Sequence, residues 1–284
     1  MADAGARPEG GALLALILGS SLLAFGPMLV RLADVAPIAS AFWRMALAAP
    51  VVLVVAEAKA PGALRRAPKG PAALAGACFA LDLAAWHLGI VRTTTANATL
   101  FANTTAFLLA AWGLVVVGER FDRHRHGPLL LAGAGAALLL WRSAELSNRH
   151  LAGDLLSLLA AAFYTGYMLA IVRLRATTPT LPALALATLF AALFLGPLAW
   201  AEGGPVWPRA WGPVVALAAS SQLLGQGLVV FASGRLAPSL LALGLLVQPL
   251  VSAAAGFLVF DERPGWPELV GAGLILAAFL WVRL

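Results

Sequence analysis

Residues 80–105 read ALDLAAWHLGIVRTTTANATLFANTT and carry most of the polar side chains that this sequence places inside apolar segments. Asp82, Trp86 and His87 lie on the first of two apolar spans, and a run of Asn and Thr residues from Asn97 to Thr105 lies on the second. Ionisable groups are costly in hydrocarbon, so they usually face a bundle interior or a water-filled cavity. The stretch is therefore predicted to line a pathway for a solute.

The composition around this stretch indicates a membrane protein. The chain has 284 residues, of which 61% are hydrophobic and only 11% charged, whereas soluble domains average about a quarter charged residues. A helical span needs about 20 apolar residues to cross the hydrocarbon core. Continuous rather than alternating apolar runs exclude a membrane β-barrel. We therefore predict an all-α integral membrane protein with ten transmembrane helices, at residues 12–33, 36–57, 71–92, 94–118, 126–143, 151–173, 181–201, 211–233, 236–260 and 266–283.

The net charge of +6 is explained by topology rather than by a nucleic-acid partner. Loops on one side of the predicted bundle carry about twice as many Arg and Lys residues as loops on the other. The positive-inside rule then places both termini in the cytoplasm, in a bacterial-type inner membrane. Lipid and a small-molecule substrate are the expected partners. A ten-helix bundle of this kind can work as a monomer.

The two halves of the chain match weakly but in a constant order. Gly70-Pro71 corresponds to Gly212-Pro213, and Gly133-Ala134-Gly135 to Gly271-Ala272-Gly273, at an offset of roughly 140 residues. Small residues of this kind let neighbouring helices approach closely in lipid. The matches predict an internal duplication.

A duplicated unit of five spans must lie in the membrane upside down relative to its twin, because five is odd. We predict a first repeat at residues 1–146 and a second at 147–284. Inverted repeats of this kind place a binding site between the two halves near the midplane, where rocking exposes it to either side. This organisation is typical of secondary transporters.

Several motifs resemble one transporter family. They are Phe42-Trp43-Arg44 on the second span, Gly153-Asp154-Leu155-Leu156 at the start of the sixth, and the helix-ending segments Val115–Glu119 and Leu258–Glu262. Together they resemble the EamA family of the drug/metabolite transporter superfamily, and within it the bacterial amino-acid exporters of the YddG type. The resemblance implies ten helices in a 5+5 arrangement.

One departure from that family's pattern concerns helix bending. Pro249 on the ninth span fits the pattern, whereas the equivalent position on the fourth span is Ala106. Proline removes a backbone donor and bends a helix. The fourth span is therefore predicted to be straighter than is typical of the family.

Polar and aromatic residues on spans three, four, six, eight and nine form the predicted substrate site. Their equivalent places in the two halves favour one shared cavity, although hydrogen bonds between helices would also explain the fourth span, and a plain polar contact would explain His87. The candidate substrate-binding residues are Asp82, Trp86, His87, Asn97, Thr99, Asn103, Tyr164, Gln222, Gln226 and Gln248.

Arg44 and Asp82 lie at similar depths if each span is counted inward at about 1.5 Å per residue. Three interpretations remain open: a structural ion pair between them, an Asp82 that faces the cavity, and an Asp82 that couples transport to a proton.

The polar but weakly charged lining favours export of amino acids or similar small zwitterions by alternating access. Nucleotide-sugars, sugar phosphates and drug-like molecules are alternative cargoes, and a non-transport scaffold is a further alternative. No phosphate loop, metal cluster or nucleophile–base set is present in the sequence, so we predict neither an enzyme nor a cofactor.

Overall fold

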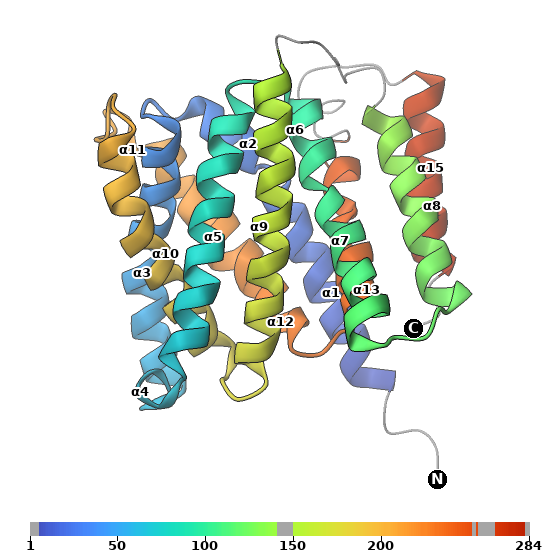
Figure 1. The fold of residues 1–284 in the computed structure, drawn as a ribbon, viewed down its shortest axis with the longest axis horizontal. Helices are drawn as coiled ribbons and strands as arrows, with labels where there is room; N and C mark the ends of the chain where they lie inside the picture. Colours follow the sequence, from blue (N-terminus) through green and yellow to red (C-terminus); the bar gives the residue numbers. More distant parts are fainter. Residues whose placement is uncertain (1–5, 141–149, 252–253, 255–264, 282–284) are drawn as a thin grey trace.

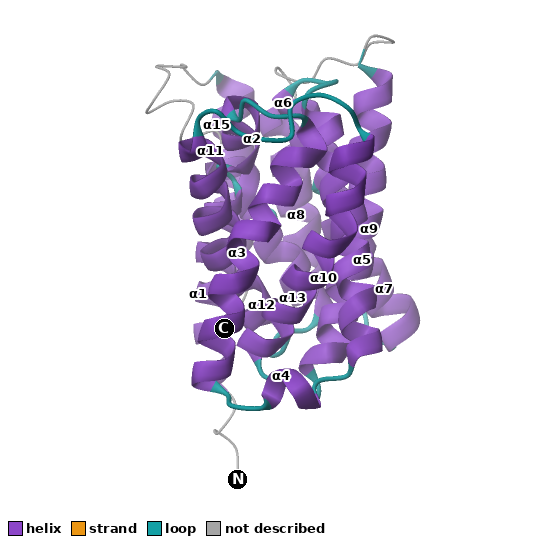
Figure 2. Ribbon diagram, turned by 90° about the vertical axis from the view of Figure 1, so that its left-hand side faces the viewer, coloured by secondary structure: helices purple, strands orange, loops and turns teal. Residues whose placement is uncertain are grey.

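The structure, a computed structural model, describes residues 6–140, 150–251, 254 and 265–281. Its helices run along one common axis, and the connections gather at the two ends of the bundle (Figures 1 and 2). No strand is found among the described residues. The prediction of an all-helical membrane protein is confirmed.

The helical elements follow the predicted spans within a few residues, and several spans consist of two or three consecutive elements. They are α1 (Ala6–Leu23), α2 (Gly26–Leu32), α3 (Pro37–Lys59), α4 (Ala63–Arg66), α5 (Lys69–Ile90), α6 (Thr95–Ala102), α7 (Thr104–Trp112), the π-helix η1 (Gly113–Val117), α8 (Arg123–Leu140), α9 (Leu151–Arg175), α10 (Thr180–Ala201), α11 (Trp211–Ala216), the π-helix η2 (Leu217–Gln226), α12 (Gly227–Ser233), α13 (Pro238–Leu245) and α15 (Trp266–Trp281).

Seven helical segments of the described chain are long and apolar enough to cross a membrane. They are Gly10–Leu32, Pro37–Lys59, Lys69–Ile90, Asn97–Val117, Leu151–Arg175, Thr180–Ala201 and Trp211–Ser233. Three shorter apolar helices, His126–Leu138, Pro238–Val251 and Leu269–Trp281, coincide with the remaining predicted spans. The motif predicted at residues 258–262 lies outside the described residues.

Two of these segments are interrupted next to the cavity described below. The first breaks after Leu23 and resumes at Gly26, with Pro27 in the opening turn of α2, where its missing N–H costs no helical hydrogen bond. The fourth is interrupted at Asn103, and Thr104 Oγ1 donates to the carbonyl oxygen of Phe101 at 2.6 Å. The interruption is a single turn residue with a right-handed helical backbone, so the prediction that this span is straighter than is typical stays a prediction.

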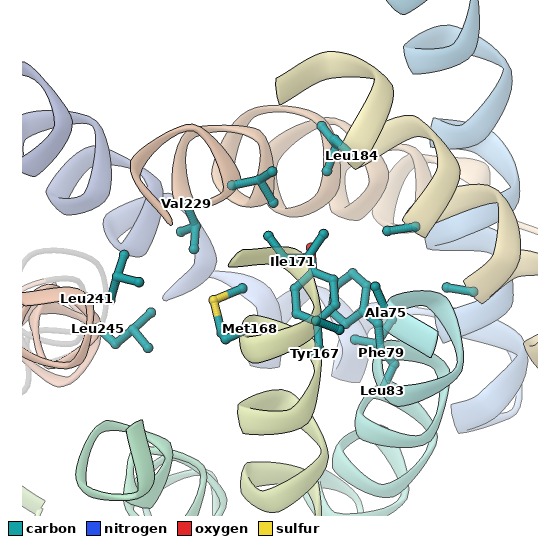
Figure 3. Packing of buried hydrophobic residues seen from close by; sticks show 14 of the residues in the cluster. Ala75, Phe79, Leu83, Tyr167, Met168, Ile171, Leu184, Val229, Leu241 and Leu245 are labelled. Atoms are coloured by element: carbon teal, nitrogen blue, oxygen red, sulfur yellow. The ribbon is translucent and has the colours of Figure 1, made fainter. Parts of the chain in front are cut away.

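The helices pack in two groups, each drawn from both parts of the chain. In the group that we call the α5 group, α5 packs against α9 and α10, and α10 packs against α3. In the α13 group, α13 packs against α1 and α7, and α1 also packs against α12 and η2. Figure 3 shows part of the core between them, with Phe79, Tyr167 and Met168 on one side and Leu241 and Leu245 on the other.

Glycines allow the closest helix contacts. A Cβ atom at Gly76 of α5 would lie 2.3 Å from Phe190 Cβ of α10, and one at Gly135 of α8 would lie 2.6 Å from the carbonyl oxygen of Gly271 in α15. Real Cβ atoms do not approach other atoms this closely, so a side chain at either position would push the helices apart. The predicted close approach is found at Gly135, whereas Gly273 has open space beside it.

Candidate functional site

A cavity lies where the α5 group meets the α13 group. It encloses about 630 Å³ of space that is free of protein atoms, open solvent included. Tyr164, halfway along α9, and Asp82, in the interior of α5, both border it, so it lies at mid-depth in the bundle. Seven of the residues singled out from the sequence line it: Arg44, Asp82, Trp86, Asn103, Tyr164, Gln226 and Gln248.

Aromatic rings and an amide form one wall of this cavity. Phe79 stacks on Tyr167, with ring centroids 4.2 Å apart and an angle of 14° between the ring planes. Gln226, the last residue of η2, donates from Nε2 to Tyr167 Oη at 3.2 Å and to Tyr164 Oη at 3.4 Å. These contacts join α5, α9 and η2 into a rigid surface that combines apolar area with hydrogen-bonding groups.

Arg44 and Asp82 are the charged residues of the lining. Arg44 is 3% exposed, and its guanidinium carbon lies 5.8 Å from the centroid of the Phe79 ring, within the range of a cation–π contact. Among the described residues, neither a hydrogen bond nor a direct ion pair joins Arg44 to Asp82. The two groups nevertheless interact electrostatically through space, so the three interpretations of this pair stay predictions.

Trp86 lies between the cavity and an apolar cluster toward one end of the bundle. Val30, Ile90 and Leu217 belong to this cluster, and Trp86 packs against it. A Cβ atom at Gly26 would lie 3.1 Å from the Trp86 ring, so α2 covers the indole closely. Arg31 fastens α2 in place by donating from Nη2 to the carbonyl oxygen of Ile90 at 2.8 Å. Trp86 is therefore packed between the cavity and α2.

Four predicted site residues are not brought to the cavity. His87 Nδ1 lies 2.7 Å from Ser40 Oγ, as the polar contact considered from the sequence would require. Asn97 and Gln222 bind neighbouring helices, as described next, and Thr99 lies on α6 one turn before Asn103. Their assignment to substrate stays a prediction, and each of the four has an interaction within the protein.

The partner of Asn97 is a buried carboxylate on α9. Asn97 Nδ2 donates to Asp154 Oδ1 at 2.9 Å, and Thr93 Oγ1 donates to the same oxygen at 2.5 Å. Asp154 is 7% exposed. In the same way, Gln222 Nε2 donates to Thr188 Oγ1 of α10 at 2.9 Å. These hydrogen bonds hold helices together at the edge of the site.

Sequence reasoning missed Phe79 and the π-helical turns of η2. Phe79 lies three residues before Asp82, a spacing that places both on one face of α5, but an isolated Phe in an apolar span gives no signal of its own. Short π-helical stretches recur at functional sites, and η2 supplies Gln226. In the described part of the chain, no group of three His, Cys, Asp or Glu residues could hold a metal ion.

Comparison with known proteins agrees with a transport cavity. Residues 151–284 match the EamA-like transporter family. The pseudopaline exporter CntI, from two strains of Pseudomonas aeruginosa, is 27% identical over 204 residues, which are 72% of this chain and 71% of the relative. A crystal structure described only as that of a protein shares the fold, with a TM-score of 0.80 at 20% identity over 95% of this chain and 94% of the other. Residues 151–284 therefore form an EamA-like transporter domain, and the comparisons support a membrane transporter.

Proposed function

We propose that this protein is a secondary transporter that exports small zwitterionic metabolites, amino acids among them, through the cavity. The observation that carries the proposal is a lining with one cation, one anion, aromatic surface and amide groups. A sugar phosphate or nucleotide-sugar would favour several cations, and Arg44 is the one cation in this lining. The relative CntI is an exporter, which supports the direction of transport.

We further propose that residues 1–146 and 147–284 are two inverted five-helix repeats that move by alternating access. Figure 1 supports this, because α1 and α9 run in opposite directions across the bundle, and the start of α1 lies on the same side as the end of α15. A site between inverted repeats near the midplane is the arrangement on which alternating access depends. The cavity supports this proposal, because it lies at mid-depth in the bundle and is lined by residues of both halves of the chain.

The end of the bundle that carries α4 is proposed to face the cytoplasm of a bacterial-type cell. Basic residues gather at this end: Lys59, Arg65, Arg66, Lys69, Arg173, Arg175 and Arg235. In a Cys78→Ala background, an impermeant thiol reagent applied to whole cells should label Arg209→Cys and not Arg65→Cys, since both positions are exposed at opposite ends. The reverse labelling would overturn the proposed orientation.

Counterflow of labelled amino acids in proteoliposomes tests the transport itself. The wild-type protein should accumulate labelled substrate against an unlabelled internal pool. Leu245→Trp, which fills the cavity lining, should abolish this exchange. Leu193→Trp makes the same change at a side chain that is 60% exposed on the surface of the bundle, and should leave it intact. Absence of flux across a broad amino-acid panel would refute the proposed substrate class.

A further inference from the structure

The cavity lining contains hydrogen-bond donors that the protein leaves without an acceptor. Among the described residues, Arg44 Nε, Trp86 Nε1 and Asn103 Nδ2 are buried and have no hydrogen-bond partner, and all three residues border the same cavity. Buried polar groups are almost always paired, and each exception calls for an explanation. Three donors on one cavity indicate that an acceptor-rich group completes them.

A charge of the opposite sign faces the same space. Asp82 is the carboxylate of the lining, and within the described chain no side chain donates a hydrogen bond to it. Arg44 is held over the ring of Phe79, one helical turn from Asp82 along α5, instead of on the carboxylate. The two charges interact electrostatically, but among the described residues neither forms a hydrogen bond to the other, so a ligand can bind each of them directly.

We propose that Arg44, Trp86 and Asn103 bind the carboxylate of the substrate and that Asp82 binds its ammonium group. A carboxylate offers two acceptor oxygens to the guanidinium, and charge-assisted hydrogen bonds of this kind are the strong ones. Phe79 and Tyr164 supply apolar surface beside the charges for the rest of the molecule. This assignment rests on the proposed export of zwitterions and deepens it, because it states which charged group of the substrate each residue binds.

The assignment predicts that each of two variants loses the binding preference for one functional group of the substrate and keeps the preference for the other. The probes are L-leucine, L-leucinamide, which lacks the carboxylate, and N-acetyl-L-leucine, which lacks the ammonium group. The wild-type protein should bind L-leucine about tenfold or more tightly than either analogue, the factor expected for one charge-assisted hydrogen bond. Arg44→Gln should lose the preference for leucine over leucinamide and keep the preference over N-acetyl-leucine. Asp82→Asn should lose the preference for leucine over N-acetyl-leucine and keep the preference for leucine over leucinamide.

Binding is measured as thermal stabilisation of the purified protein by each probe, and transport as counterflow in proteoliposomes. Arg92→Gln removes an exposed arginine that lies away from the cavity, and it should keep both preferences. If Arg44→Gln fails to fold, Trp86→Phe and Asn103→Ala each remove one hydrogen-bond donor. Each should reduce the ratio of the affinity for leucine to the affinity for leucinamide.

Equal weakening of all three probes in Arg44→Gln, or an unchanged ratio, would overturn the assignment while leaving zwitterion export intact. Binding of the probes with the predicted preferences but without counterflow would instead refute the proposed export. A wild-type protein that neither binds nor exchanges any probe would refute both.

Discussion

The hydrogen bonds of Asp154 give the most direct test of how the site is supported. Its Oδ1 accepts from Thr93 and Asn97, which belong to the connection after α5 and to α6. A hydrogen bond to a charged group contributes about 1.5–3 kcal/mol. Because both bonds share one oxygen and are not additive, we expect Asp154→Ala to lower the free energy of unfolding by about 2–4 kcal/mol. For a chain of this size the melting temperature should then fall by about 4–16 °C.

The single cysteine provides the assay. Cys78 is partly buried on α5, and a Cβ atom at Gly166 of α9 would lie 3.2 Å from its sulfur. A thiol-reactive fluorescent dye added during heating therefore reports separation of α5 from α9. Asp154→Asn keeps an acceptor oxygen and should lose no more than half as much stability as Asp154→Ala. Identical melting of wild type and Asp154→Ala, or equal losses in the two variants, would refute the reasoning.

Three further predictions use the same thiol assay. Gly244→Ala would place a Cβ atom 2.2 Å from Leu16 Cδ2 and should cost about 1–3 kcal/mol; in a Leu16→Ala background, which removes the clashing atom, the same substitution should cost much less. Gly76→Ala should destabilise as much without rescue by Phe190→Ala, because the clash is with Phe190 Cβ, which alanine retains. Burial raises the pKa of Glu202 above its ordinary 4.5, although backbone amides of α3 bind it. The native state then holds more protons, so stability should fall as pH rises above 4.5, and Glu202→Gln should flatten that profile; an equally steep profile would contradict this.

The bounds of the helices could be predicted closely from the sequence because they depend on one property, the length of each apolar run. A span must be long and apolar enough to cross hydrocarbon, and this criterion is read residue by residue. The second predicted span, residues 36–57, thus corresponds to Pro37–Lys59, and the sixth, 151–173, to Leu151–Arg175. The interruption at Asn103, beside which Thr104 Oγ1 donates to the carbonyl oxygen of Phe101, was not predicted, because the sequence argument considered only proline.

The members of the site were harder to predict. Helical spacing shows which residues share one face of a helix, but it does not show which neighbouring helix packs against that face. Gln222 and Gln226 lie four residues apart, yet Gln222 meets Thr188 of α10, and Gln226 meets Tyr164 and Tyr167 of α9. Because they are one turn apart along the axis of η2, the two side chains contact different neighbouring helices. Which neighbour is present depends on how adjacent helices are placed, and no local pattern encodes that placement.

The position of the cavity between two packing groups has a mechanical consequence. The α5 group supplies both charges and the aromatic surface, and elements outside it supply Asn103, Gln226 and Gln248. A substrate that contacts both groups interacts differently with any two arrangements of them, and a ligand shifts a conformational equilibrium only through such a difference. Contacts with one group alone would bind a substrate without favouring either arrangement. On the proposed alternating-access mechanism, contacts of the substrate with Asn103 and Gln248 are therefore the ones through which binding would favour one arrangement of the two groups over another.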